Sequence, residues 1–441
     1  MPVVATRRVT FRLYPNKQQE SKLHYWRKLH KDLFNACLYQ RKVEYEKFGK
    51  SISYLDQQNL LPAFKECWVE YKELGSHALQ ATVKRVDFAY KRFFQKLGGR
   101  PLFKSARFYR GWTYPCSSGW KVSTNGDNGY LCLTNLGNIQ MRGKARQWGI
   151  PTTCTVMWKQ GKWYASITVD CNPARETGCG AIGLDFGTFH AVATSDDELI
   201  ENPRFLASSN QKVKQASRKL RKKQAPNIRK KIKASKRWRK ARHNVSRLQQ
   251  KVTRQREDWQ HKVAAQIVSC NSARSFSGGN LQKALMRAVA TEKLSLKRMT
   301  RGVKKGKGKR QKAGLNRSLL DVGIGNLISL IKYKLEECQG VFVEVPTTKV
   351  APSQTCPACG RKEKKNLSQR IHDCPCGCML DRDVAAAQVM LARTLAGGNL
   401  QPLSSAWALG TSVLNRGVEA STSTHTYCGG FKQASAMRRQ K

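Results

Sequence analysis

The chain has 441 residues, of which 40% are apolar and 9% aromatic, so it is long enough for several globular domains and too apolar for a disordered polymer. Its 81 Lys and Arg residues against 29 Asp and Glu residues give a formal net charge of +52, which indicates a polyanionic partner such as nucleic acid. No run approaches the roughly 18 apolar residues of a membrane-spanning helix, and residues 1–8 lack the apolar core of a signal peptide, so we expect a cytoplasmic protein without membrane contact.

The fifteen cysteines fall into two groups. Ten are scattered singly, a pattern typical of reduced thiols that are buried as small apolar side chains. The other five crowd between positions 356 and 378, and such crowding in a reducing compartment indicates a metal site.

The start of the chain predicts one strand followed by helices. Residues 7–14 alternate between apolar and polar side chains and end at Pro15, which predicts a strand with one basic, solvated face. From Asn16 the apolar residues recur at helical spacing, and further helices are predicted at about 61–73 and 76–97. The pattern fits two interpretations equally well. One is a helical insert that binds a nucleic-acid duplex, and the other is a helical bundle with a packing role only.

Residues 111–171 are rich in Trp, Tyr, Thr and Gly and contain short alternating runs, which predict a small β-barrel that the first strand joins. Residues 154–169 are expected to form a hairpin that turns at Gln160 and Gly161. Exposed aromatic residues here offer base stacking, but Trp and Tyr are also ordinary strand residues.

A candidate catalytic carboxylate, Asp185, lies within residues 183–196. A short apolar run leads to Asp185, and a glycine turn and a second strand-like run follow it. An RNase H-type sheet presents its first metal ligand in this way, although other ribose-binding or ATPase-like sheets also contain Gly-x-Asp-x-Gly. Asp185 therefore needs carboxylate partners from elsewhere in the chain.

The next segment is strongly basic. Residues 209–258 predict a long polar helix pair broken near Pro226, and residues 211–250 hold 17 Lys or Arg and no Asp or Glu. Charge runs are often only solvated faces, but a block without acids repels itself and gains counterion release on binding phosphates, so we interpret it as a nucleic-acid-facing surface. A second basic block, 301–312, contains three glycines and is expected to be a mobile loop.

Two later strands each lie near a carboxylate that is a candidate partner of Asp185. The first ends at Glu292, and the second, 341–346, contains Glu344 and follows a predicted helix at 315–337. Strands that alternate with helices indicate an α/β sheet. The stronger β pattern of the second strand favours Glu344.

The clustered cysteines form two knuckles, Cys356-Pro-Ala-Cys359-Gly and Cys374-Pro-Cys376-Gly-Cys378. Four thiolates suit a tetrahedral Zn²⁺, so we predict a structural zinc ribbon held by Cys356, Cys359, Cys374 and Cys376, with Cys378 spare. A closed four-thiolate site leaves no position for substrate. A redox Cys-x-x-Cys motif is the alternative, but it accounts for one knuckle only.

A helix is predicted at 380–391, directly after the ribbon. Asp381 and Asp383 lie at its start, and its three alanines allow close packing on a sheet. Carboxylates at a helix start are often only caps. Together with Asp185 and a glutamate from a later strand, however, Asp383 would complete a cluster that holds two divalent cations for phosphodiester cleavage.

In their order along the chain, these motifs resemble the TnpB family of transposon-encoded RNA-guided nucleases, which are related to compact type V CRISPR effectors. The matching segments span most of the chain: FRLYP at 11–15, GLDFG at 183–187, EKL at 292–294 with Met299, KAGLNRS at 312–318, SQTCPACG at 353–360 and DRD at 381–383.

The resemblance implies a multidomain architecture that combines α/β and α+β parts. These parts are a wedge-like β-barrel at 1–15 and 111–180, a helical recognition domain at 16–110, an RNase H-like (RuvC-like) nuclease domain at 181–350 and 379–396 that includes the basic segment 209–258, and the zinc ribbon at 351–378. The remaining residues, 397–441, match no fold signal and are expected to be disordered.

The resemblance also implies a site and its partners. Asp185, Glu292 and Asp383 would be the catalytic residues and the ligands of two Mg²⁺ ions, with Asp381 as the fallback for Asp383. The family places its glutamate before a Leu-containing turn, which selects Glu292 over Glu344. Guide RNA and a double-stranded DNA target would be the partners, in the cytoplasm and nucleoid of a prokaryotic cell.

Three features depart from the family pattern. An extra segment, 275–286, precedes Glu292. In the second cysteine knuckle the spacing is shortened, so that only Pro375 separates Cys374 from Cys376. Ala385 stands where the family usually has Asn.

We therefore expect an RNA-guided DNA endonuclease that checks a short flanking motif and cuts both strands in turn at one carboxylate site. Two alternatives remain open. One is an RNA-guided DNA-binding regulator without nuclease activity, and the other is a basic DNA-binding protein with a zinc ribbon and no RNA.

Overall fold

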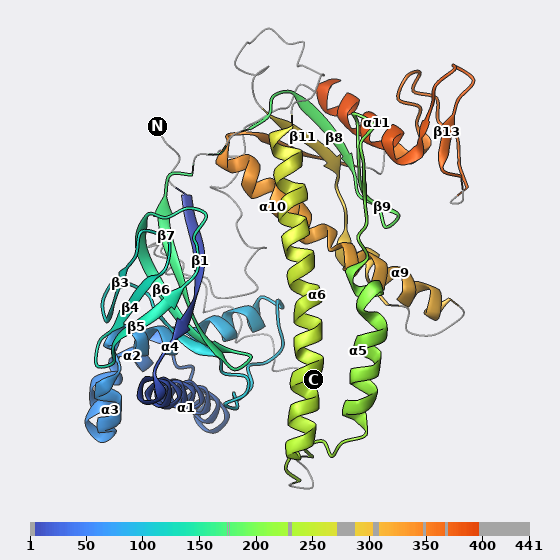
Figure 1. The fold of residues 1–441 in the computed structure, drawn as a ribbon. Helices are drawn as coiled ribbons and strands as arrows, with labels where there is room; N and C mark the ends of the chain where they lie inside the picture. The colour runs from blue at the N-terminus through green and yellow to red at the C-terminus, as the bar shows by residue number, and fades with distance from the viewer. Residues whose placement is uncertain are drawn as a thin grey trace. The chain divides into compact units, whose positions relative to one another are not determined.

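The computed structural model describes residues 5–173, 175, 177–227, 232–270, 287–302, 308–346, 350–366 and 369–396 (Figure 1). The predicted extra segment at 275–286 and the predicted disordered tail at 397–441 lie outside these residues. The fold divides into two compact units, one reaching Asn172 and the other beginning at Pro173. Within the described residues, no helix is long and apolar enough to cross a membrane.

Three helices of the N-terminal unit begin where the sequence predicts, at residues 17, 61 and 76, but the predicted helix at 61–73 is divided at Trp68, and the short helix at 54–59 was not predicted. Asn16 caps α1 (Lys17–Phe48): its side chain accepts a hydrogen bond from the Gln19 amide, and the Gln19 side chain accepts one from the Asn16 amide. Gly49, with φ of 64°, ends this helix in the left-handed conformation that glycine adopts readily. The other helical elements are α2 (Tyr54–Asn59), α3 (Leu61–Cys67), the 3₁₀ helix η1 (Val69–Glu73) and α4 (Ser76–Phe94).

A seven-stranded antiparallel sheet completes this unit, in the order β2-β6-β7-β1-β5-β4-β3. Its strands are β1 (Ala5–Tyr14), β2 (Gly111–Tyr114), β3 (Trp120–Ser123), β4 (Gly129–Leu133), β5 (Gly137–Arg142), β6 (Ile150–Lys159) and β7 (Lys162–Cys171). The first strand joins this sheet between β7 and β5, as predicted, and the predicted β6–β7 hairpin turns at Gln160 and Gly161. The order runs from β2 to β3 without a pairing between these two, so among the described strands the hydrogen bonds do not close a complete barrel. Both edge strands are only four residues long, and short edges limit pairing with other chains.

A five-stranded sheet forms the centre of the C-terminal unit, in the order β10-β9-β8-β11-β12. The strands are β8 (Ala181–Asp185), β9 (His190–Thr194), β10 (Leu199–Glu201), β11 (Ala288–Glu292) and β12 (Val341–Val345). β8, β11 and β12 are parallel to one another, whereas β9 and β10 are antiparallel to their neighbours. The prediction of strands at 288–292 and 341–346 is confirmed.

The helices of this unit are α5 (Phe205–Arg221), α6 (Lys236–Ser269), α8 (Leu296–Met299), α9 (Lys309–Val322), α10 (Ile324–Glu337) and α11 (Arg382–Ala396). The segment between β12 and α11 contributes the short elements η2 (Pro352–Gln354), β13 (Ile371–Asp373) and β14 (Met379–Asp381), and β13 pairs with β14. The predicted break near Pro226 is confirmed, and α5 and α6 run side by side as a helical hairpin (Figure 1).

The single helix predicted at 315–337 is wrong. The first helix starts at Lys309, so the expected mobile loop is helical over 309–312, while 303–307 lie outside the described residues. The helix breaks at Gly323, which has φ of 69°. The Gln260 side chain donates to the carbonyl oxygens of Val322 and Gly323 at 2.6 and 3.1 Å, and this contact from α6 occupies the place that a side chain at 323 would need.

The five-stranded sheet is covered on both faces. Ile182, Leu184 and Val289 point to one face, where α6, α9 and α10 bury them. Ala181 and Ala288 point to the other face and pack against Leu391 of α11. This arrangement is an α/β layer structure. Because β8, β11 and β12 are parallel neighbours, their carboxyl ends lie at the same edge of the sheet.

Candidate active site and zinc ribbon

Asp185 and Glu292 end two neighbouring parallel strands. Leu184 of β8 pairs with Thr291 of β11, so the following residues, Asp185 and Glu292, lie side by side at the carboxyl edge of the sheet. Side chains in register on adjacent strands point to the same face. That face is the one covered by α11, because Gly183, two residues before Asp185, contacts that helix.

Helix α11 brings the third predicted carboxylate to this edge. It packs on β8 and β11, and Ala385, Ala386 and Ala387 are buried there, which confirms the prediction that small residues allow close packing (Figure 1). A Cβ atom on Gly187, just beyond the end of β8, would lie 3.9 Å from Oδ2 of Asp383. Asp383 therefore lies at the end of β8, beside Asp185.

The neighbouring Asp381 is the N-terminal cap of helix α11. Its Oδ1 accepts hydrogen bonds from the backbone amides of Asp383 at 2.8 Å and Val384 at 3.4 Å, which caps the start of α11. This cap fixes the first turn of the helix and so the position of Asp383, and it favours Asp383 over Asp381 as the residue that faces Asp185.

The three carboxylates interact electrostatically. Burial first, and then the charges of Asp383 and Glu292, raise the pKa of Asp185 to about 7, although the Phe186 amide and Arg382 act in the opposite direction. Outside the ribbon, no three Asp, Glu, His or Cys ligand atoms of the described residues lie within 4.8 Å of one another. The three carboxylates are thus close enough to interact electrostatically, but their ligand atoms do not all lie within 4.8 Å of one another.

Two arginines contact Asp383, and the sequence analysis missed both. Arg382 lies 3.3 Å from Oδ1 of Asp383, and Arg370 lies 3.9 Å from Oδ2. Arg370 also stacks over the ring of Phe189 at 5.2 Å, and its carbonyl oxygen accepts a hydrogen bond from the Arg382 amide at 2.7 Å. Arg382 lies inside the Asp-Arg-Asp motif, which was the available signal, whereas nothing in the local pattern marks Arg370.

Glu344, which the strand pattern favours, lies on the opposite face of the sheet. It pairs in register with Thr291, one residue before Glu292, so its side chain points away from Asp185. There it forms an ion pair with Lys332 of α10 at 3.0 Å. The geometry therefore agrees with the choice of Glu292 that the family resemblance implies.

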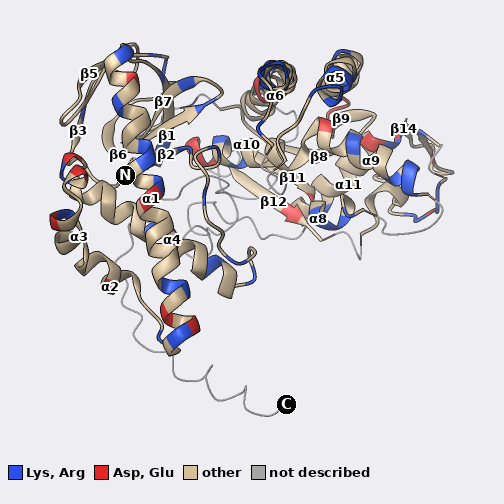
Figure 2. Cartoon of the chain, turned by 90° about the horizontal axis from the view of Figure 1, so that it is seen from below, with Lys and Arg blue, Asp and Glu red and all other residues tan. Residues whose placement is uncertain are grey.

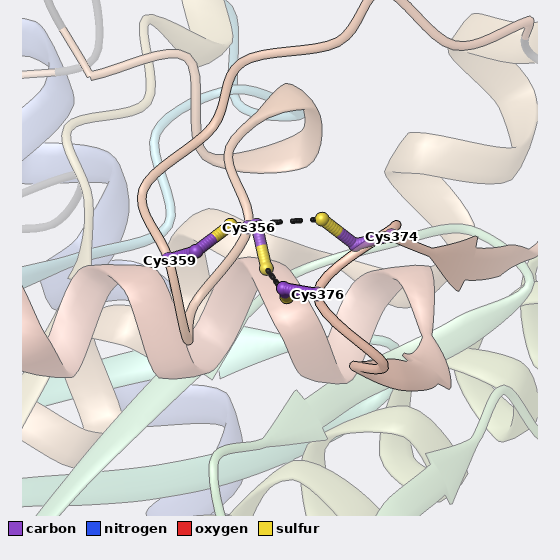
Figure 3. A group of neighbouring side chains, drawn as sticks. All are labelled: Cys356, Cys359, Cys374 and Cys376. Atoms are coloured by element: carbon purple, nitrogen blue, oxygen red, sulfur yellow. Dashed lines mark hydrogen bonds between the residues drawn. The ribbon is translucent and has the colours of Figure 1, made fainter.

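The two cysteine knuckles bring four thiols together (Figure 3). The sulfur atoms of Cys356 and Cys376 are 3.7 Å apart, and those of Cys359 and Cys374 are 3.6 Å apart. A tetrahedral zinc ion with Zn–S bonds of about 2.3 Å separates its sulfur ligands by roughly 3.8 Å, so these thiols fit the ion.

The surroundings of the thiols also suit a cation. Burial opposes ionisation of Cys356, but the amides of Cys359 and Ala358 and the His372 side chain lower its pKa to about 5. The amide of Cys376 favours the Cys374 thiolate, yet burial and the neighbouring thiols raise the pKa of Cys374 to about 12. Four thiols so close together cannot all ionise without a positive ion among them.

Two basic surfaces are candidates for nucleic-acid contact. Along α5 and α6, Lys and Arg residues are frequent (Figure 2), and within 205–256 the chain has no Asp or Glu. The second surface, 91–110 in the N-terminal unit, has seven Lys or Arg and no acid, and it was missed because its charges are spread over a helix end and a loop. Five of its apolar side chains are more than half exposed, namely Phe94, Leu97, Leu102, Phe103 and Phe108. Exposed rings among cations suit stacking with unpaired bases.

The close approach of α11 to the sheet leads to a testable prediction. A Cβ atom on Gly183 would lie 2.0 Å from the carbonyl oxygen of Ala387, so Gly183→Ala has to push α11 away from β8. We expect a loss of about 2 kcal/mol of stability from overpacking, measured by urea unfolding, and a displaced Asp383. Gly314→Ala in α9 is the control, because its Cβ atom meets nothing within 4 Å. Equal stability of the two variants would contradict the close packing.

Three segments of the chain match known families. Residues 164–284 match OrfB_IS605, described as "Probable transposase", residues 325–390 match the "Cas12f1-like, TNB domain", and residues 1–50 match the "Helix-turn-helix domain" of OrfB_IS605. The described part of the last span consists of β1 and the uninterrupted helix α1, so its fold is a strand and one long helix.

Similar proteins and structures extend over most of the chain. "Putative RNA-guided DNA endonuclease InsQ" from Escherichia coli (strain K12) is 28% identical over 376 residues, which cover 82% of this chain and 86% of that protein. A "Putative RNA-guided DNA endonuclease" from Streptomyces pristinaespiralis is 26% identical over 397 residues, covering 88% and 89%. Among solved structures, a Cas12f1-sgRNA-target DNA complex has 11% identity and a TM-score of 0.47, covering 90% of this chain and 100% of that one. The mini-RNA-guided endonuclease CRISPR-Cas_phi3 has 10% identity and a TM-score of 0.45, covering 90% and 94%.

Proposed function

Because the chain belongs to the TnpB family, we propose that it is an RNA-guided DNA endonuclease that cuts target DNA next to a short flanking motif. The observation that carries this proposal is the meeting of Asp185, Glu292 and Asp383 at one edge of an α/β sheet, in a chain with a net charge of +52. Both DNA strands would be cut in turn at this single RuvC-like site.

The carboxylates would hold two Mg²⁺ ions. Carboxylate oxygens are ligands that Mg²⁺ prefers. Burial and the charges of Asp383 and Glu292 raise the pKa of Asp185, and a divalent ion would stabilise the buried carboxylate against both effects, so this shift supports a cation site. When bound, such ions supply an activated water and neutralise the leaving oxygen. The strands β8 and β11 hold Asp185 and Glu292 in register, and the cap by Asp381 holds Asp383.

The zinc ribbon would support the site without taking part in the chemistry. Its hairpin β13–β14 leads directly into α11, and Arg370 at the start of that hairpin contacts Asp383. A closed four-thiolate site keeps such a hairpin folded. The ribbon therefore orients Arg370 and the start of α11.

The partners would be a guide RNA and double-stranded DNA. Guide pairing reads the target sequence, while the protein holds the backbones through positive charge. The basic surfaces at 205–256 and 91–110 are the proposed contacts, the first for phosphates and the second for phosphates and unpaired bases.

The α5–α6 surface gives a prediction on salt dependence. Replacing Lys214 and Arg218, exposed residues one helical turn apart on α5, with Gln should lower the slope of log affinity against log salt by up to about 2 for the RNA–protein or DNA–protein complex. Replacing Lys159 and Lys162 at the tip of the β6–β7 hairpin with Gln removes the same charge and should leave the slope nearly unchanged. If both pairs lower it equally, net charge and not the α5–α6 surface governs binding.

The function is tested by purifying the full chain with its copurifying RNA, sequencing that RNA, and supplying matched DNA with Mg²⁺. We expect a discrete RNA species and cleavage that RNase treatment or a mismatched target abolishes. Tight guided binding without cleavage would instead identify an RNA-guided regulator. DNA binding with no discrete RNA would refute RNA guidance and leave a plain basic DNA-binding protein.

A further inference from the structure

The zinc ribbon has more potential ligands than a four-coordinate ion uses. Besides the four thiols in Figure 3, a second group of ligand atoms, from Cys356, His372 and Cys378, also lies within 4.8 Å of one another. Cys356 is the member that both groups share. Zinc accepts imidazole nitrogen as readily as thiolate in structural sites, so the second group has the right chemistry for the same ion.

His372 is placed as a ligand would be. It is only 3% exposed, its ring lies beside the Cys356 thiol, whose pKa it lowers, and its Nδ1 lies against the Lys365 side chain. The ligand atoms in reach of this ring are the sulfur atoms of Cys356 and Cys378.

The second knuckle is a tight turn that carries two thiols, Cys376 and Cys378, within 4.8 Å of the Cys356 sulfur. Gly377 has φ of 83°, its amide donates to the Cys374 carbonyl oxygen at 2.9 Å, and the Cys374 amide donates to the Cys378 carbonyl oxygen at 3.2 Å. Cys376 and Cys378 flank this glycine, and each belongs to a group of ligand atoms that includes Cys356. Cys376 is exposed, whereas Cys378 is partly covered.

From this geometry we propose that the ribbon holds zinc through either of two ligand sets that share Cys356, and that Cys378 and His372 take over when Cys376 is lost. In the exchange, the bonds from zinc to the Cys376 sulfur and to one of Cys359 and Cys374 would break, and bonds to the Cys378 sulfur and the His372 nitrogen would form in their place. Cys378 would give its thiol proton to the released thiolate, and the other of Cys359 and Cys374 would remain as the fourth ligand. Zinc keeps its charge throughout, and no oxidant or reductant is needed.

A second ligand set would serve the stability of the ribbon and not nuclease activity, because it would retain zinc after chemical modification of Cys376. Exposed thiolates are the ones that alkylating and oxidising agents reach first. A ribbon that kept zinc after losing Cys376 would also keep the β13–β14 hairpin, and with it the contact between Arg370 and Asp383.

Metal content and cobalt spectra of the full chain test the proposal. Cys376→Ser should retain about one zinc per chain, and its Co²⁺ form should show weaker thiolate charge-transfer absorption and ligand-field bands at shorter wavelength, since nitrogen replaces a sulfur ligand. Cys356→Ser should lose the metal, because both sets need this residue. Release of zinc from Cys376→Ser as complete as from Cys356→Ser would overturn the proposal.

Double variants identify the replacing ligands. Adding Cys378→Ser or His372→Gln to Cys376→Ser should weaken zinc binding about tenfold or more. Adding Cys132→Ser, in β4 and outside the ribbon, removes a thiol as a matched control and should change nothing. Unchanged affinity in the Cys376→Ser/Cys378→Ser chain, or loss of zinc from Cys378→Ser alone, would each refute the exchange.

A measurement on chains that keep Cys376 covers the case in which its variants fail to fold. Iodoacetamide should alkylate the exposed Cys376 of the parent protein while zinc stays bound, whereas the Cys378→Ser chain should release zinc as alkylation proceeds. Mass spectrometry locates the modified thiol, and a zinc-sensitive dye records the release. Equal release from both chains would contradict a reserve role for Cys378.

Discussion

Asp185→Asn is expected to abolish DNA cleavage and, at the same time, to stabilise the metal-free protein. The residue ends β8 beside Glu292 and near Asp383, and removing its charge would take away a proposed metal ligand, which should lower the cleavage rate about 10³-fold or more. The same charge is unfavourable in the folded protein without metal, because it is buried among other carboxylates. Function and stability should therefore change in opposite directions.

The pH dependence follows from the sign of the pKa shift. The folded protein keeps the Asp185 proton up to a pH of about 7, whereas the unfolded chain releases it near the ordinary aspartate pKa of 3.8. Between these values the folded state binds more protons, so the stability of the metal-free protein falls as pH rises from about 4 to 7 and levels off above that. In Asp185→Asn this fall should be absent.

Thermal unfolding in EDTA between pH 4 and 8 measures the effect, and added Mg²⁺ should raise the unfolding temperature of the parent far more than that of Asp185→Asn. Asp197→Asn is the matched control, because Asp197 is exposed in the turn after β9 and its φ of 65° is one that Asn tolerates. A parent protein whose stability does not fall over this pH range, or a variant that still cuts, would show that Asp185 is not a crowded metal ligand.

Local patterns in the sequence predict most of the elements of the fold. The alternation in β1, the β6–β7 hairpin, the strands that end at Asp185 and Glu292, and the capped start of α1 all depend on residues close in sequence. The four zinc thiols are predicted for the same reason, since two short knuckles define them.

What the pattern does not predict depends on contacts between distant residues. The break at Gly323 reflects the Gln260 side chain from α6. The contact of Arg370 with Asp383 joins the ribbon to α11, and that of Cys356 with His372 joins two parts of the ribbon itself. Periodicity also leaves open which face of the sheet a carboxylate occupies. That face is decided by which helix covers it, and α11 follows β12 by more than thirty residues.

Glu292→Gln and Glu344→Gln form a matched pair that tests this choice of face. Both residues lie at the carboxyl ends of adjacent parallel strands, and they are offset by one register position, so their side chains point to opposite faces. Glu292 faces the α11 side with Asp185, whereas Glu344 pairs with Lys332 of α10. We expect Glu292→Gln to lower guided DNA cleavage about 10³-fold and Glu344→Gln to leave it nearly unchanged.

The same pair separates catalysis from stability. Glu344 and Lys332 are both about one-third exposed, so losing their ion pair should cost less than about 1 kcal/mol. Both variants should therefore bind the guide RNA and target DNA as the parent does, and only Glu292→Gln should fail to cut. Loss of cleavage in Glu344→Gln alone would place the metal site on the α10 face. Equal loss in both would mean that total negative charge at this edge, and not the register of β11 against β8, determines activity.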